Sequence, residues 1–138
     1  MSTLGGGGPI ALPETSQQKV KVFTLNLAQA AATYTLATCN AVGGVLILGV
    51  DIYVATAGAT FTSVSIQTND TTAVEILSAA EGAVANLTVG KNVAKTFTGP
   101  TYLHTSKLIT YTIIGATGTG SLRVIVRYTP TLSGADIS

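Results

Sequence analysis

The chain of 138 residues is poor in charged side chains and in the residues that most often carry chemistry. Lys, Arg, Asp and Glu make up 9% of the sequence, against about 25% in a typical globular domain. There is no Trp, one Cys and one His. The low charge predicts a neutral surface of Thr, Ala, Ser and Gly, which suits a protein packed against copies of itself or against a larger assembly.

The single Cys39 and the single His104 exclude several kinds of site within one chain. A disulfide needs two cysteines, and a Cys/His zinc site needs several ligands. A catalytic triad would have to combine His104 with one of three aspartates, and no serine lies in a nucleophile-elbow sequence. These aspartates are Asp51, Asp70 and Asp136. We therefore expect no catalytic residue, no metal, no cofactor and no enzymatic activity.

Charge and hydropathy also argue against two classes of partner. The longest apolar run, Val45–Val50, is followed at once by Asp51 and is far shorter than the roughly 20 residues of a bilayer-spanning helix. A net charge of +1 offers no attraction to nucleic acid or to anionic lipid. The first residues lack the features of a secretory signal, which together with the lone cysteine predicts folding in a reducing cytoplasm.

Residues 1–18 differ in composition from the rest of the chain. Gly5–Gly8 is followed by Pro9 and Pro13, which predicts an extended, flexible arm. At about 3.3 Å per residue the arm can span roughly 60 Å, enough to reach across a neighbouring subunit. Its isolated apolar side chains are candidate partner contacts: Leu4, Ile10 and Leu12. The predicted organisation is an arm at 1–18, a β-sandwich domain at 19–130 and a C-terminal tail at 131–138.

Eight short segments alternate in hydropathy with a period of two and predict antiparallel strands. They are Val20–Leu27, Thr33–Thr38, Val45–Val54, Thr62–Thr68, Ala73–Leu77, Val93–Thr98, Leu108–Ile114 and Leu122–Tyr128. With no long helix between them, they favour an all-β, jelly-roll-like antiparallel sandwich over a βαβ sheet. An immunoglobulin-like sandwich is the neighbouring option, without its Cys…Trp…Cys signature.

Several details follow from the local pattern. Within Val45–Val54 the parity that begins at Leu46 is wholly apolar and is predicted to face inward. Val20–Leu27 changes parity, which predicts a bulge or burial on both faces. Gly115–Gly120 predicts a hairpin connection. Leu77–Ala85 carries a capping pattern but supports at most one helical turn.

Asp51, Arg123 and Arg127 are the candidate interaction residues of the domain. Asp51 is the single acid in an apolar strand, and it either faces solvent or pairs across an interface with Arg123, Arg127 or a lysine. Arg123 and Arg127 flank Ile125 on one strand face, a combination favoured at protein interfaces. The alternative is an ordinary solvated strand face.

Four stretches between Val45 and Tyr128 carry a resemblance to a known family: Gly49–Val54, Ser63–Asp70, Ile76–Gly82 and, at the end, Val124–Pro130. They resemble small β-sandwich structural proteins of tailed bacteriophages. The resemblance implies a virion component made in the host cytoplasm, specifically a capsid decoration or cement protein. Such a protein would bind as a trimer on the outside of the head and bridge major capsid subunits. The resemblance supplies no catalytic residue for this chain.

A second function stays open at this point, that of a receptor- or glycan-binding module of a tail fibre or adhesin. Such a module needs an exposed aromatic platform. Tyr102 and His104, in the predicted Pro100–Ser106 loop, are its best candidates.

Overall fold

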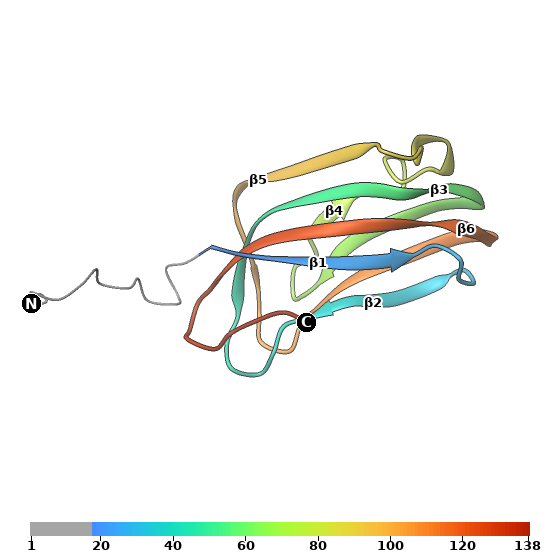
Figure 1. Cartoon of the computed structure of the whole chain (residues 1–138). Helices are drawn as coiled ribbons and strands as arrows, with labels where there is room; N and C mark the ends of the chain where they lie inside the picture. Colours follow the sequence, from blue (N-terminus) through green and yellow to red (C-terminus); the bar gives the residue numbers. More distant parts are fainter. Residues whose placement is uncertain (1–17) are drawn as a thin grey trace, which may run out of the picture.

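The computed structural model describes residues 18–138, and it describes the backbone but not the side chains of residues 93–100 (Figure 1). The predicted arm, with Leu4, Ile10 and Leu12, lies outside the described residues except for its last residue. The strands are β1 (Lys19–Asn26), β2 (Ala32–Thr38), β3 (Val45–Asn69), β4 (Glu75–Leu77), β5 (Asn92–Leu103) and β6 (Leu108–Pro130), and the short 3₁₀ turn η2 spans Val84–Asn86.

The strands pair in two groups of four segments, and every pairing is antiparallel. In the first group, the β1 half, β1 pairs with the C-terminal part of β6, which pairs with the N-terminal part of β3, which pairs with β5. In the second group, the β2 half, the order is β2, the N-terminal part of β6, the C-terminal part of β3, and β4. β3 and β6 pass through both groups and join them into one six-stranded sheet, an arrangement compatible with the predicted jelly-roll-like sandwich. The predicted all-β antiparallel fold is confirmed, with β3 and β6 each supplying two of the eight predicted strands.

β3 and β6 turn back together at one end of the molecule (Figure 1). The turning segments stay paired, with Ala59 opposite Thr119 and Phe61 opposite Gly115, while the register shifts repeatedly. Gly115 and Gly120 have φ angles of 103° and 126°, which side chains with a Cβ rarely adopt. The hairpin predicted at these glycines is therefore wrong. They form the bend of one continuous strand that passes from the β2 half to the β1 half.

One hydrophobic core fills the space between the halves. In β3, residues 50, 52 and 54 are buried as predicted, but upstream Val45 and Ile47 are buried while Leu46 and Leu48 are only partly covered. The register shift between Ile47 and Gly49 explains the difference. An extra residue in a bulge moves the side chains before it to the opposite face. The prediction of one inward parity along this whole segment is wrong.

β1 is regular, and the predicted bulge is absent from it. Its register with β6 runs without a shift from Lys19 to Asn26. Leu25 is fully buried, whereas Val20 and Val22, on the opposite face, are 55% and 58% exposed. The parity change therefore reflects neither a bulge nor burial on both faces, but an apolar pair left at the surface.

The capping pattern after β4 forms without an α-helix. The Ser78 N–H donates to Glu81 Oε1 at 3.0 Å, and the Glu81 N–H donates to Ser78 Oγ at 3.1 Å. This is a reciprocal capping box. Gly82 then returns to the sheet, where its carbonyl accepts a hydrogen bond from Val64 N–H at 3.0 Å. A capped turn followed by η2 is the whole of the helical structure in this segment.

Residues 131–138, the predicted tail, pack onto the domain. Ala135 and Ile137 are fully buried. Thr38 and Ser138 exchange two backbone hydrogen bonds of 2.8 and 3.0 Å beside the end of β2. The tail thus extends the hydrogen bonding at the edge of the β2 half.

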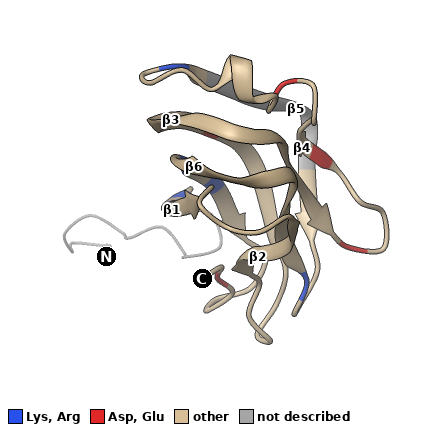
Figure 2. Cartoon of the chain, turned by 90° about the vertical axis from the view of Figure 1, so that its right-hand side faces the viewer, with Lys and Arg blue, Asp and Glu red and all other residues tan. Residues whose placement is uncertain are grey.

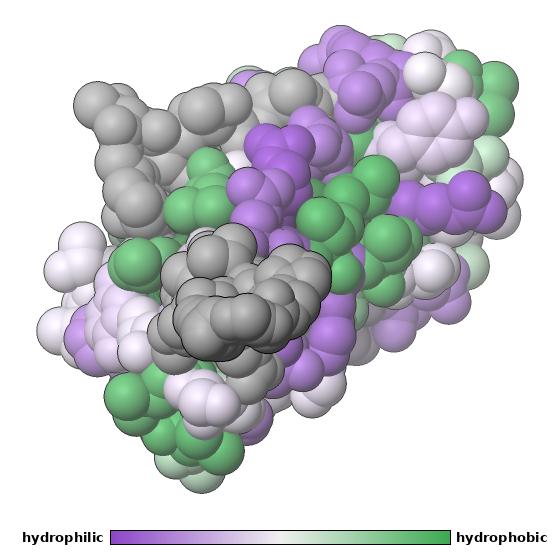
Figure 3. Space-filling view, turned by 60° about the vertical axis from the view of Figure 1, so that its left-hand side comes forward, coloured by the Kyte–Doolittle hydropathy of each residue, from purple (hydrophilic) through white to green (hydrophobic). Residues whose placement is uncertain are grey.

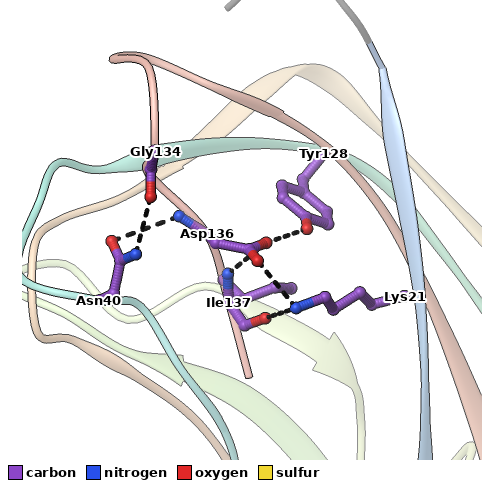
Figure 4. Close-up of polar contacts among 6 residues, drawn as sticks. All are labelled: Lys21, Asn40, Tyr128, Gly134, Asp136 and Ile137. Atoms are coloured by element: carbon purple, nitrogen blue, oxygen red, sulfur yellow. Dashed lines mark hydrogen bonds and ion pairs between the residues drawn. The ribbon is translucent and has the colours of Figure 1, made fainter. Parts of the chain in front are cut away.

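Asp136 fastens this tail to β1 and to the C-terminal part of β6 (Figure 4). Its carboxylate accepts hydrogen bonds from the Tyr128 hydroxyl and, at 2.9 Å, from Lys21 Nζ, which also donates to the Ile137 carbonyl at 2.6 Å. Burial tends to raise the pKa of Asp136, but the hydrogen bonds from Tyr128 and Lys21 outweigh it and lower the pKa. Lys21 also places a charged group on an edge strand, which discourages pairing with another chain.

Charged side chains are thinly spread over the fold (Figure 2). Among the described residues, no helix is long and apolar enough to cross a membrane.

Candidate interaction surfaces

Asp51, Arg123 and Arg127 come together on the outer surface of the β1 half, which we call the arginine face. Ile125 lies opposite Val22 on one side and opposite Asp51 on the other. Arg127 Nη1 donates to Asp51 Oδ2 at 2.6 Å. Asp51 therefore pairs with one of the predicted residues, but within the chain and not across an interface. Both side chains are partly exposed. Such a pair contributes about 0–1 kcal/mol to stability, so stability alone gives little reason for it.

Exposed apolar groups accompany the two arginines. Val20 and Val22 project from β1 on this face, and the Tyr53 side chain, 37% exposed, lies opposite Arg123 in the register. Figure 3 brings forward the end of the molecule where β1 begins, and apolar patches lie there beside strongly hydrophilic ones. Arginine and aromatic residues beside aliphatic groups are typical of protein interfaces.

The outer surface of the β2 half is different, and we call it the hydroxyl face. Two rows of cross-strand neighbours run over this face, each with one residue from β2, one from β6 and one from β3. They are Thr33–Thr112–Ser65 and Thr35–Thr110–Gln67. The hydroxyls of Thr33 and Thr112 are hydrogen-bonded at 2.8 Å. Neither of these rows contains a charged residue, and Glu75 of β4 lies beyond Gln67 at the edge of the face. A flat partner can therefore cover the two rows without desolvating an ion.

A surface depression of about 510 Å³ lies between the connection that follows β3 and the end of β5. Its lining consists of Asp70, Thr71, Thr72, Val74, Thr101, Tyr102 and His104. Tyr102 belongs to β5 and only His104 to the following loop, so the predicted Pro100–Ser106 loop is wrong in extent. The rings of Tyr102 and His104 meet edge to face, with centroids 4.2 Å apart.

Asp70 holds His104 in place. Its carboxylate accepts hydrogen bonds from the His104 backbone N–H at 2.8 Å and from Nδ1 at 2.8 and 3.0 Å. The Thr71 N–H donates to it at 2.6 Å. Burial tends to raise the pKa of Asp70, but the hydrogen bonds from His104 and Thr71 outweigh it and lower the pKa to about 2. Asp70 is therefore a carboxylate at neutral pH.

The remaining reactive residue, Cys39, is enclosed. Its side chain is fully buried and donates to the Gly43 carbonyl at 3.2 Å. Burial raises the pKa of the thiol, which disfavours the reactive thiolate. In the part of the chain that the structure describes, no three His, Cys, Asp or Glu side chains are grouped to hold a metal ion.

Two of these clusters were not predicted from the sequence. Asp70 and His104 are 34 residues apart, and Lys21 and Asp136 are 115 residues apart. Asp70 was one of the three acids considered for His104, and the pairing found is with that residue. Which of the three aspartates lies near His104 follows only from the pairing of the strands, because no local sequence pattern relates residues so far apart.

No family model and no curated protein matches the sequence. The fold is nevertheless similar to chains of two solved phage structures. One is from the acidic stable capsid structure of Helicobacter pylori bacteriophage KHP30, with a TM-score of 0.52 and 15% identity over 88% of this chain and 97% of that chain. The other is from the cyanophage Pam1 capsid asymmetric unit, with a TM-score of 0.52 and 18% identity over 89% and 94%.

These similarities extend over nearly the whole of both chains in each comparison. At such low identity they establish a shared fold. The resemblance to β-sandwich structural proteins of phages, predicted from the segment between Val45 and Tyr128, is confirmed at that level.

Proposed function

We propose that this protein is a non-enzymatic structural component of a bacteriophage virion. More specifically, it is a decoration or cement protein on the outside of the head that bridges neighbouring major capsid subunits. The observation that carries this proposal is the shared fold with two phage capsid chains over 88 and 89% of this chain. The low surface charge supports it, because a neutral surface is inexpensive to desolvate against neighbours.

The arginine face and the arm are the proposed contacts with the capsid. Arg123, Arg127 and Asp51 provide directional hydrogen bonds, and Val20 and Val22 provide apolar area beside them. Leu4, Ile10 and Leu12 of the arm are the proposed anchors in pockets of a neighbouring subunit. Each fully buried anchor contributes roughly 1.5–3 kcal/mol, and several anchors in one oligomer act together through avidity.

The hydroxyl face is the proposed contact between copies of the protein, which we propose to form a trimer. Its rows of threonines are flat and uncharged, and hydroxyls both donate and accept hydrogen bonds across an interface. In this arrangement the arginine face stays available for the shell. The protein is synthesised in the host cytoplasm and joins the head from there.

The absence of an activity is part of the proposal. His104 and Asp70 form two members of a triad, but in the described part of the chain no serine or cysteine lines the depression beside them. The alternative of a glycan-binding module is favoured by one observation, the pairing of Tyr102 with His104, and is developed below as a site on the same protein.

Co-sedimentation with heads of the phage that encodes the protein tests this function. The full chain is expected to sediment with heads and to have the mass of a trimer in solution. A variant lacking residues 1–18 is expected to keep the circular dichroism of the full chain and to stay in the supernatant. A full chain that does not bind heads overturns the proposal, whereas equal binding by the truncated variant overturns only the role of the arm.

A further inference from the structure

The depression beside Tyr102 has the volume of a small-molecule site and a lining fixed by hydrogen bonds. Its volume of about 510 Å³ lies within the roughly 300–1,000 Å³ of typical ligand pockets. It is bounded by two segments that are distant in sequence, 70–74 and 101–104, and Asp70 joins them through its hydrogen bonds to His104. The lining is therefore held in position before any ligand arrives.

The hydrogen bonds of the His104 ring with other described residues use Nδ1 and leave Nε2 available. The Asp70 carboxylate can only accept hydrogen bonds, so the His104 Nδ1 beside it carries the proton. In the neutral imidazole, Nε2 then has a free lone pair and acts as an acceptor. The His104 side chain is 57% exposed, whereas that of Asp70 is only 3% exposed. A ligand hydroxyl can therefore donate to His104 from solvent.

Tyr102 supplies an aromatic surface next to this acceptor. It is 40% exposed, and its ring packs against the edge of His104 at an interplanar angle of 83°. A Cβ at position 44 would collide with the Tyr102 ring, so Gly44 allows the ring to lie where it does. The exposed part of the ring can stack against an apolar ligand face, such as the C–H face of a sugar ring.

The charges of the lining define the class of ligand. Among the described side chains, no Lys or Arg lines the depression, so none of them compensates a phosphate, a sulfate or an acidic sugar. The single carboxylate is occupied by His104 and by the Thr71 N–H. The hydroxyls of Thr71, Thr72 and Thr101 add groups that donate and accept. One aromatic surface, one acceptor and several hydroxyls match a neutral polyol.

We propose that the depression lined by Tyr102, His104 and the neighbouring threonines binds a neutral saccharide. Tyr102 stacks against the sugar, the His104 Nε2 accepts a hydrogen bond from one sugar hydroxyl, and Asp70 positions the imidazole. This site is distinct from the contacts proposed above, because its lining includes none of the residues proposed to contact the head or a neighbouring copy. A negative result for saccharide binding would therefore leave the proposed structural role in the virion unaffected, and the reverse also holds.

Saturation-transfer difference NMR on the full chain tests the site with lactose, maltose, cellobiose and N,N′-diacetylchitobiose as probes. We expect at least one of these neutral sugars to bind with a dissociation constant at or below about 10 mM. Tyr102→Ala and His104→Ala are each expected to weaken binding at least about tenfold, and Tyr102→Phe, which keeps the ring, to bind like the wild type. Tyr53→Ala removes a comparably exposed tyrosine from the arginine face and is the matched control.

Three outcomes overturn the proposal. The first is that none of the four sugars binds. The second is that binding survives both Tyr102→Ala and His104→Ala in variants that melt like the wild type. The third is that sialyllactose, an acidic sugar, binds while the neutral sugars do not, because the lining has no cationic side chain to favour it.

Discussion

The two outer faces of the sandwich differ although the same two long strands, β3 and β6, run through both. The arginine face carries Arg123, Arg127 and Asp51 beside exposed valines, whereas the rows of the hydroxyl face are Thr, Ser and Gln. Both faces cover one shared core, so folding does not require the difference. The outward face of an antiparallel sheet is commonly solvated and polar, so the core does not decide which polar side chains occupy it. The difference between the faces is the reason we propose a different partner for each.

The largest expected effect is on the arginine face. Arg123→Glu reverses an exposed charge and is expected to weaken binding to phage heads about 100-fold, because a charge complementary to the partner becomes repulsive. Thr35→Glu introduces the same residue on the hydroxyl face and serves as the control, because it can weaken head binding only indirectly, through lost avidity of the oligomer, and is expected to do so less. Quantitative co-sedimentation measures both. Weaker binding by the control than by Arg123→Glu would reverse the assignment of the faces.

The next effect is on the hydroxyl face. Thr35→Arg places a charge at the β2 end of a neutral row and is expected to raise the dissociation constant between copies about tenfold or more. Sedimentation equilibrium gives the mass in solution at several concentrations. Thr24→Arg on β1, opposite Arg123 in the register, is the matched control and is expected to leave self-association unchanged. If only the control dissociates the copies, the arginine face is where they meet.

A smaller effect separates a structural ion pair from an interaction residue. Asp136→Asn removes the charge that Tyr128 and Lys21 contact, and we expect a loss of about 1–3 kcal/mol in unfolding free energy. Asp51→Asn makes the same change in the partly exposed pair with Arg127, for which we expect about 0–1 kcal/mol. Urea denaturation measures both. Equal losses would mean that the arginine-face pair is a stabilising element after all.

The last expected effect is a pH dependence of the stability, which arises from the Asp70 carboxylate beside His104. The pKa of Asp70 is about 2 in the folded chain against 3.8 ordinarily, so its stabilisation is complete above about pH 4 and is lost as the pH falls toward 2. We expect this loss to be about 1–2 kcal/mol. Asp136, whose pKa is also lowered, acts in the same direction.

Urea denaturation at about pH 5 and about pH 2.5 compares the wild type with Asp70→Asn. The variant is expected to be less stable at the higher pH and to lose less stability on acidification. An unchanged loss in Asp70→Asn would show that the hydrogen bonds to His104 contribute nothing to the acid sensitivity.

The local parts of the fold were predictable from the sequence. Alternation of apolar and polar residues is a short-range signal, and all eight predicted segments lie in or overlap observed strands. The continuity of β3 and β6 was not predictable, because Gly115 and Gly120 have the composition of a turn and only their pairing with the bend of β3 makes them part of a strand. The bulge before Gly49 was missed because both parities there are apolar.

The candidate interaction residues show the same division between local patterns, which the sequence reveals, and long-range contacts, which it does not. Arg123 and Arg127 were recognisable because they alternate with Ile125 on one strand. The exposure of Val20 and Val22 was not, because an apolar residue on an edge strand looks in sequence like a core residue. The clusters at Asp70 and Asp136 depend on contacts between distant parts of the chain, which no local period encodes.

A reconstruction of the phage head by electron cryomicroscopy tests the central claim most directly. The account predicts density for this sandwich on the outer surface of the shell, with Arg123 and Arg127 turned toward the major capsid protein and the threonine rows turned toward neighbouring copies. Heads without this domain would contradict the proposed function. Heads in which the threonine rows of Thr33 and Thr35 lie against the shell would contradict the division of labour between the two faces.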